Sequence, residues 1–154
     1  MKIVAIVQAR MGSTRLPNKV MRPIGNAPMI EVLLDRLSGS RRIDEIVVAT
    51  SQHSDNAPLV ELVRNLGFCV FAGSEDDVLD RYYRAAFLHK ADVVVRITGD
   101  CPLVDPEVVD GVVDAFKSQI VDYASNTNPP SYPDGLDVEV FSFSALHTAW
   151  TEAS

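Results

Sequence analysis

The sequence predicts an α/β fold of three layers, in which helices cover both faces of a mostly parallel β-sheet. Two observations lead to this prediction. Short apolar runs with almost no polar alternation, such as Lys2-Ile-Val-Ala-Ile-Val7, are typical of parallel strands buried on both faces. Between these runs lie segments whose apolar residues recur at helical spacing, and strands that alternate with helices form parallel sheets. Such sheets bind ligands at the carboxyl ends of their strands.

The expected strands are short and separated by polar or glycine-containing segments. Residues 137–141 alternate polar and apolar side chains, which predicts one polar face and a place near an edge of the sheet. The other expected strands, in chain order, are 2–7, 45–50, 68–72, 92–98 and 122–125.

The first two helices are expected on stripes of apolar residues. Pro28 is predicted to open a helix that runs through Leu37 and ends at the Ser38-Gly-Ser40 turn. A second stripe runs from Leu59 to Leu66, before a glycine cap at position 67. The sequence therefore places a helix after each of the first two strands.

Three further helices are expected later in the chain. The segment from Gly73 begins one that runs to about Lys90, with acidic residues in its first turn, where the helix dipole favours them. Asp105 and Pro106 form a strong helix start, because aspartate is a favoured N-cap and proline suits the first helical position. Ser144 is predicted to cap the last helix.

Composition describes an ordinary globular chain. Its 154 residues predict a single domain, and the net charge of −7 argues against non-specific binding to nucleic acid. No apolar run reaches the ~18 residues of a membrane span, and no cleavable signal is visible, so we expect a cytoplasmic protein. The two cysteines, Cys69 and Cys101, and the three histidines show no metal-ligand spacing, which fits a reduced compartment.

A basic loop, residues 8–19, follows the first strand. Residues 1–30 hold five basic residues and no acidic one, although the chain as a whole is acidic. Arg10, Arg15 and Lys19 surround Gly12 in this loop, and guanidinium, ammonium and flexible backbone together suit a polyphosphate. The loop has neither the three glycines of a dinucleotide fingerprint nor the Gly-Lys-Ser/Thr end of a P-loop. A solvated basic turn is the simpler alternative.

The pattern Gln8-Ala-Arg-x-Gly-Ser-Thr-Arg-Leu-Pro-x-Lys19 resembles the signature loop of the cytidylyltransferase family. This family includes the CMP-sugar synthetases for Kdo and sialic acids and the spore-coat polysaccharide cytidylyltransferases. The resemblance is greatest to the spore-coat type, and four further stretches agree with it: 25–30, 73–81, 96–103 and 132–141. The resemblance implies a Rossmann-like fold of the nucleotide-diphospho-sugar transferase type.

The resemblance also implies roles for particular residues. Asp100, in the Gly-Asp pair after the fourth strand, corresponds to the family's metal ligand, and Mg²⁺ prefers one or two carboxylates with phosphate oxygens and water. Arg15 and Lys19 would neutralise the β- and γ-phosphates of CTP, and these two residues with Asp100 are the expected catalytic group. The expected nucleotide contacts are Gln8, Ala9, Arg10, Gly12, Ser13, Thr14, Ser74 and Arg81.

Several of these residues have simpler explanations. Asp100 could serve only to form a turn with Pro102. Arg96, inside a strand, is expected to pair with a carboxylate beside the site, in a structural or a catalytic role. Asp134 and Asp137 suggest acceptor binding or a second metal contact, although Asp134 also suits a turn. Further alternatives are internal hydrogen bonds for Ser13 and Thr14, a helix start for Asp76 and Asp77, and a small buried apolar residue for Cys101.

The expected function is transfer of CMP from CTP to a sugar or sugar-acid acceptor, with release of pyrophosphate, in surface polysaccharide biosynthesis. A guanylyl- or uridylyltransferase is an alternative, because the sequence contains no readable base code. A non-catalytic nucleotide-binding domain of a larger polysaccharide enzyme is another. The last helix lacks a stop signal, so we expect a longer natural protein. The resemblance to the family further implies a homodimer at full length and little transferase activity from residues 1–154 alone.

Overall fold

The structure is a computed structural model that describes residues 1–12, 15–127 and 136–153. Its centre is a six-stranded sheet with the strand order β5-β4-β1-β6-β8-β7. Four strands are parallel: β1 (Ile3–Gln8), β4 (Glu45–Ser51), β5 (Cys69–Gly73) and β6 (Val93–Thr98). β1 lies in the middle of this group, and all but its last residue are buried, as the apolar run predicts.

Two antiparallel strands extend the sheet beyond β6. β8 (Glu139–Ser142) pairs with β6 on one side and with β7 (Tyr123–Ser125) on the other. The strand predicted at 137–141 is thus present next to the edge, and β7 is the edge strand. The later strand in the chain enters between β6 and β7, an insertion that the strand pattern alone does not predict.

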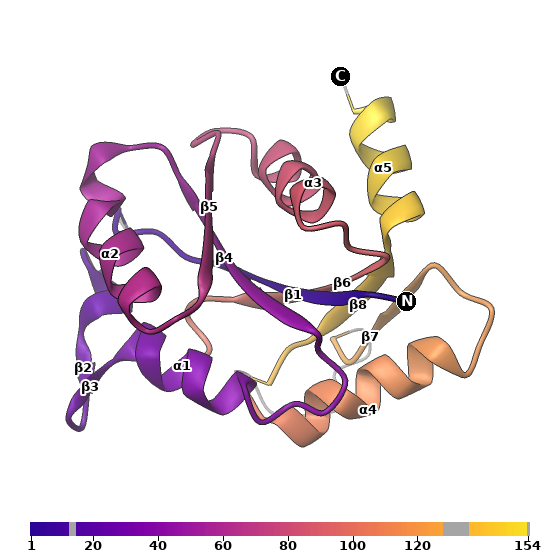
Figure 1. Ribbon diagram of the computed structural model, residues 1–154, viewed down its shortest axis with the longest axis horizontal. Helices are drawn as coiled ribbons and strands as arrows, with labels where there is room; N and C mark the ends of the chain where they lie inside the picture. Colours follow the sequence, from indigo (N-terminus) through magenta and orange to yellow (C-terminus); the bar gives the residue numbers. More distant parts are fainter. Residues whose placement is uncertain (13–14, 128–135, 154) are drawn as a thin grey trace.

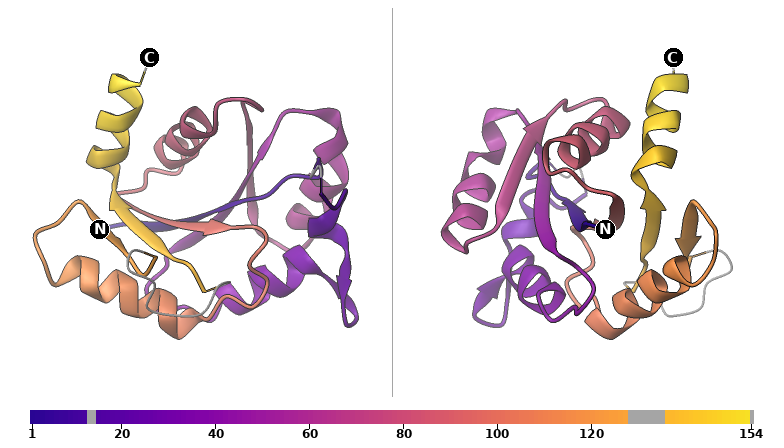
Figure 2. Two further views of the ribbon diagram at one scale, coloured as in Figure 1. Left: turned by 180° about the vertical axis from the view of Figure 1, so that it is seen from behind. Right: turned by 45° about the vertical axis from the view of Figure 1, so that its right-hand side comes forward.

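Helices cover both faces of the sheet, which confirms the three-layer α/β prediction (Figures 1 and 2). The helices α1 (Met29–Leu37), α2 (Ala57–Asn65) and α4 (Pro106–Lys117) pack on one face, through a core that includes Leu33, Leu59 and Val113. α3 (Val78–Leu88) and α5 (Phe143–Glu152) pack on the other, through a second core that includes Ala85 and Leu146.

Two of the predicted helix starts are wrong. α3 begins at Val78 rather than near Gly73, because the Asp77 side chain caps it by accepting a hydrogen bond from the backbone N of Asp80. The acidic residues at 75–76 therefore precede the helix. α5 is capped by Ser142 rather than Ser144, and the Ser142 Oγ accepts from the backbone N of Ala145.

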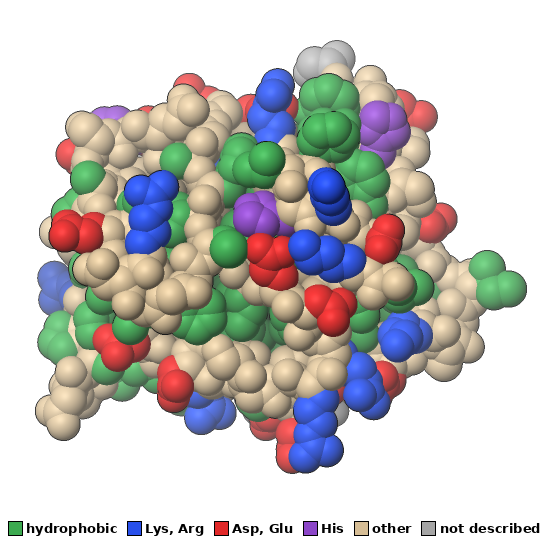
Figure 3. Space-filling view, viewed as in Figure 1, with side chains coloured by type: hydrophobic (Ala, Val, Ile, Leu, Met, Phe, Trp, Pro, Cys, Tyr) green, Lys and Arg blue, Asp and Glu red, His purple; other side chains and the backbone are tan. Residues whose placement is uncertain are grey.

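A short hairpin in the structure is not predicted from the sequence. β2 (Pro23–Ile24) and β3 (Ala27–Pro28) pair around Gly25, whose φ of +63° is readily adopted by glycine, and α1 starts only at Met29. Among the described residues, no helix has the length and apolar character needed to cross a membrane. Acidic and basic side chains are intermingled on the face drawn in Figure 3.

Candidate active site

The candidate site lies where the chain changes direction across the sheet. From β1 the chain continues to β4 and β5 on one side, and then crosses to β6 on the other side of β1. The carboxyl ends of β1 and β6 are therefore the switch point at which open α/β sheets bind ligands. Gln8 and Ala9 stand at the end of β1, and Thr98 ends β6 two residues before Asp100.

Gly99 joins these two strand ends. Its backbone N donates a hydrogen bond of 2.7 Å to the carbonyl oxygen of Gln8. A Cβ atom at position 99 would lie 2.6 Å from that oxygen and 2.9 Å from the Cβ of Ala9. Only glycine allows so close an approach, and this contact places Asp100 beside the start of the basic loop.

The basic loop has a fixed beginning and end. At its beginning, Met11 is buried, and its backbone N donates to the Oδ1 of Asn56 at 2.8 Å. At its end, Asn18 adopts a left-handed conformation with a φ of +59°, and its backbone N donates to the Met11 carbonyl oxygen at 3.0 Å. Val20, in the 3₁₀ turn η1 (Lys19–Met21), is buried against the main core. The loop is thus anchored at both ends.

Asn56 supports the site but is not among the residues predicted from the sequence. Its side chain is 3% exposed and, besides accepting from Met11, donates to the Oγ of Ser51 at 2.7 Å. It connects the end of β4 to the loop that follows β1. An asparagine just before a helix is the sequence signal that could have indicated this role, and it equally describes an ordinary N-cap.

The cationic side chains of the loop are accessible. Arg10 and Arg15 are exposed and Lys19 is partly exposed, and within the described residues none of the three forms an ion pair with a carboxylate. Gly12 is exposed as well. The structure therefore leaves this positive charge available to an anionic ligand. The predicted contacts Ser13 and Thr14 lie outside the described residues.

Arg81 places a buried guanidinium near the carboxyl ends of the parallel strands. It lies in α3, is 2% exposed, and its Nη1 donates to the carbonyl oxygen of Ser74 at 3.2 Å, while its Nε has no hydrogen-bond partner among the described residues. Burial lowers the pKa of Arg81, and the nearby positive charge of Arg10 lowers it further. The negative charge of Glu75 acts in the opposite direction, but Arg81 forms no ion pair with a carboxylate among the described residues. A buried cation of this kind suits a bound anion. Ser74, just after β5, also supports α3 by accepting from the backbone N of Asp77.

Asp100 is exposed in the turn after β6, where the backbone N of Cys101 donates to the Thr98 carbonyl oxygen. Burial raises the pKa of the Cys101 thiol, and the negative charges of Asp100 and Asp137 act in the same direction. Both carboxylates therefore lie near this buried thiol. A raised pKa keeps Cys101 protonated, which fits its predicted role as a small buried apolar residue rather than a nucleophile. An accessible carboxylate with a second one nearby fits the oxygen ligands that Mg²⁺ prefers.

A cavity of about 170 Å³ adjoins this position. In it, Arg96 Nη1 forms an ion pair of 2.7 Å with Glu139 Oε2, which confirms the predicted pairing of Arg96 with a carboxylate. The Tyr123 hydroxyl donates to the other oxygen of Glu139 at 2.8 Å. The residues that line the cavity are Arg96, Thr98, Thr127, Asp137 and Glu139. Its hydroxyls can donate hydrogen bonds to a polyhydroxylated molecule and accept them, and its carboxylates can accept them. Asp134 lies outside the described residues.

Comparison with known proteins identifies the family. The family profile described as cytidylyltransferase matches residues 4–154. An uncharacterized protein of Methanocaldococcus jannaschii is 46% identical over 153 residues, which are 99% of this chain and 62% of the relative. The spore coat polysaccharide biosynthesis protein SpsF of Bacillus subtilis is 42% identical over 132 residues, 83% of this chain and 55% of the relative. The chain thus spans somewhat more than half the length of these relatives.

Solved structures agree with this comparison. A cytidylyltransferase from Leptospira borgpetersenii superposes with a TM-score of 0.95 at 35% identity, covering 100% of this chain and 66% of that one. A CMP:2-keto-3-deoxy-manno-octonic acid synthetase complexed with CTP has a TM-score of 0.82 over 100% of this chain and 79% of its own; at 18% identity it supports the fold alone. The sequence, the fold and these matches together show that the chain belongs to the cytidylyltransferase family.

Proposed function

We propose that this chain binds CTP with Mg²⁺ at the carboxyl ends of β1 and β6, and that the protein transfers CMP from it to an acceptor hydroxyl. The observation that supports this most directly is the contact between Gly99 and Gln8, which sets Asp100 beside the basic loop. Asp100 can bind a hard cation, and the accessible side chains of Arg10, Arg15 and Lys19 can bind phosphates. All four lie in loops at the carboxyl ends of the strands.

The proposed reaction needs mainly positioning and neutralisation of charge. The acceptor oxygen bonds to the α-phosphorus and loses its proton, while the bond from that phosphorus to the α,β-bridging oxygen breaks and pyrophosphate leaves. Arg15 and Lys19 would neutralise the β- and γ-phosphates, and Arg10 would bind the same triphosphate. Mg²⁺ held by Asp100 would supply further neutralisation of the phosphate oxygens.

We further propose that the acceptor is a sugar or sugar acid and that it binds in the cavity of Arg96 and Glu139. The hydroxyls of Thr98 and Thr127 suit a sugar. Transferase activity, a role in surface polysaccharide biosynthesis and homodimer formation are proposed for the full-length protein, because the relatives are longer than this chain.

The nucleotide is tested by thermal stability. With Mg²⁺ present, CTP is expected to stabilise the protein more than UTP, GTP or ATP does. At a hundred times its dissociation constant, a bound ligand adds about 2.7 kcal/mol to the free energy of unfolding. Equal stabilisation by all four nucleotides would contradict the cytidine assignment, and a preference for GTP or UTP would favour a guanylyl- or uridylyltransferase. CTP binding without pyrophosphate release by the full-length protein, across a panel of sugars and sugar acids, would indicate a non-catalytic domain.

The proposed metal role of Asp100 is tested by Asp100→Asn. Asparagine keeps the shape and the turn-forming capacity of aspartate but loses the charge that a hard cation needs. We therefore expect CTP binding to lose its dependence on Mg²⁺ while the melting temperature stays nearly unchanged, as measured by calorimetry with and without the ion. A variant that melts several degrees lower but keeps its Mg²⁺ response would show that Asp100 is structural.

A further inference from the structure

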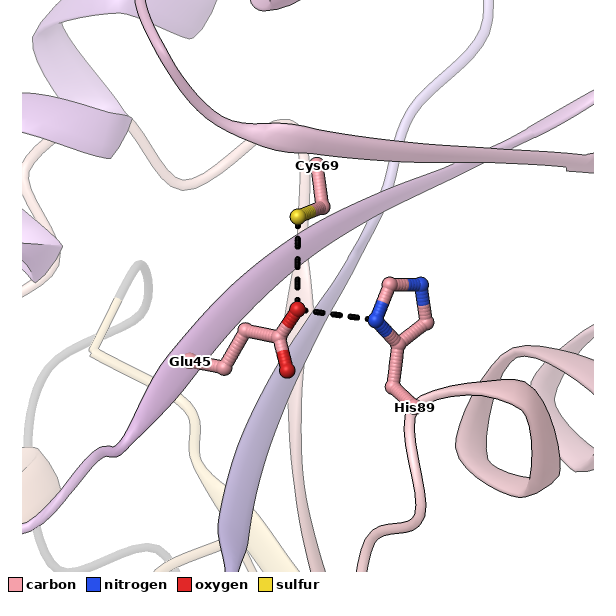
Figure 4. A group of neighbouring side chains, drawn as sticks. All are labelled: Glu45, Cys69 and His89. Carbon is pink, nitrogen blue, oxygen red and sulfur yellow. Dashed lines mark hydrogen bonds and ion pairs between the residues drawn. The ribbon is translucent and has the colours of Figure 1, made fainter.

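Three side chains of types that bind metals converge at the amino ends of the parallel strands, whereas the candidate active site lies at their carboxyl ends. Glu45 is the first residue of β4, Cys69 is the first residue of β5, and His89 is the C-cap of α3, shortly before β6. All three therefore lie at the amino ends of the parallel strands. One carboxylate oxygen, one thiol sulfur and one imidazole nitrogen from these residues lie within 4.8 Å of one another (Figure 4).

The contacts within this cluster are short and share one atom. Glu45 Oε1 accepts a hydrogen bond from Cys69 Sγ at 3.2 Å and lies 2.8 Å from His89 Nδ1, as the dashed lines in Figure 4 mark. Around a tetrahedral ion with metal–ligand distances of about 2.0–2.3 Å, neighbouring oxygen, nitrogen and sulfur ligands lie about 3.3–3.5 Å apart, so both contacts would lengthen by roughly half an ångström or less. Small side-chain rotations would direct all three atoms at one ion.

We propose that Glu45, Cys69 and His89 form a site for a thiophilic divalent cation, with Zn²⁺ as its best-suited ion. Thiolate, imidazole and carboxylate are the ligands that Zn²⁺ takes in proteins, whereas Mg²⁺ and Ca²⁺ take oxygen ligands. Cys69 is exposed, so a water molecule from solvent can supply the fourth ligand of a tetrahedron.

Charge balance also fits a dication. Lys2 Nζ forms an ion pair of 2.7 Å with Glu45 Oε2, the carboxylate oxygen that faces away from the cysteine and histidine contacts. One thiolate and one carboxylate neutralise the two charges of Zn²⁺, which leaves the Lys2 ammonium as a positive charge beside a neutral complex. The thiol gives up a proton when the ion binds, because only the thiolate is a ligand.

The site would be structural rather than catalytic. It would tie the starts of β4 and β5 to the segment between α3 and β6, across three parts of the chain that are far apart in sequence. It lies at the amino edge of the sheet, whereas Arg15, Lys19 and Asp100 belong to loops at the carboxyl edge. Zinc bound there should therefore stabilise the fold by mass action without changing the affinity for nucleotide.

The test measures Zn²⁺ binding by calorimetry and thermal stability, in the protein as given and in Cys69→Ser, Glu45→Gln and His89→Ala variants. We expect one ion per chain, with the affinity reduced more than about tenfold in each variant, since loss even of an outer-shell partner costs 10–100-fold. Co²⁺ as a probe should give a thiolate charge-transfer band that is lost in Cys69→Ser. Cys101 is retained in that variant, so the comparison also separates the two cysteines.

Two matched controls complete the experiment. His147→Ala, which removes a histidine in α5, should leave the zinc affinity unchanged, and Lys2→Met should keep or tighten it by removing a neighbouring cation. Exposed Cys69 can be replaced by serine without opening the core, so the variant should fold, as its metal-free melting temperature will show. Absence of stoichiometric binding, or a zinc affinity that Cys69→Ser does not alter, would overturn the proposal.

Discussion

Replacing Arg81 with methionine is expected to stabilise the ligand-free protein while weakening its binding of nucleotide. Arg81 is 2% exposed, its Nε lacks a partner among the described residues, and burial together with the charge of Arg10 lowers its pKa. Replacing buried ion pairs with apolar side chains of similar volume is often neutral or stabilising by about 1–4 kcal/mol, and Arg81 forms no ion pair with a carboxylate among the described residues that would offset its burial. If the guanidinium contacts the nucleotide, its loss should weaken CTP binding by about 1.5–3 kcal/mol.

The opposite signs of these two effects make the experiment decisive. Chemical denaturation without ligand measures the first, and calorimetric titration with CTP and Mg²⁺ measures the second. Arg84→Met is the matched control, because Arg84 lies on the same helix but is exposed and pairs with Asp80 at 2.7 Å. That change should alter stability by no more than about 0.5 kcal/mol and leave binding intact. If Arg81→Met destabilises the free protein and CTP binds as before, Arg81 is a structural residue.

Replacing Gly99 with alanine is expected to damage both the fold and the candidate site. The added Cβ would lie 2.6 Å from the Gln8 carbonyl oxygen, which is backbone and cannot rotate away. Relief of this overlap must separate the ends of β1 and β6, at a cost of about 1–3 kcal/mol or more. The separation also moves Asp100 away from the basic loop, and a misplacement of about 1 Å can reduce the rate of a reaction about a hundredfold.

The matched control for Gly99 is Gly111→Ala. Gly111 lies within α4, and nothing stands within 4 Å of the position that its Cβ would occupy. Alanine there should stabilise the protein by about 0.5–1 kcal/mol, because glycine is unfavourable inside a helix. Thermal denaturation of the two variants, with pyrophosphate release by the full-length protein, checks both expectations. A Gly99→Ala protein as stable and as active as the parent would show that the contact is not needed.

The sequence by itself predicted most of the local elements and indicated a basic loop suited to a phosphate ligand. Apolar runs identified the buried strands, and Asp105 with Pro106 marked the start of α4, where the Asp105 side chain accepts from the backbone N of Glu107. The basic loop, with Arg15 and Lys19, could also be recognised, because its residues are close together in the sequence. These signals depend on residues within a few positions of one another, and such short-range preferences can be read directly from the chain.

Only the tertiary structure decided which distant residues meet. β8 inserts between β6 and β7, which brings Glu139 to Arg96, although the two are far apart in the chain. The burial of Arg81, the support of Met11 by Asn56, and the convergence of Glu45, Cys69 and His89 likewise depend on strand order and on packing between layers. No local pattern encodes these contacts, because each joins segments whose separation in space is set by the whole sheet and not by their spacing in sequence.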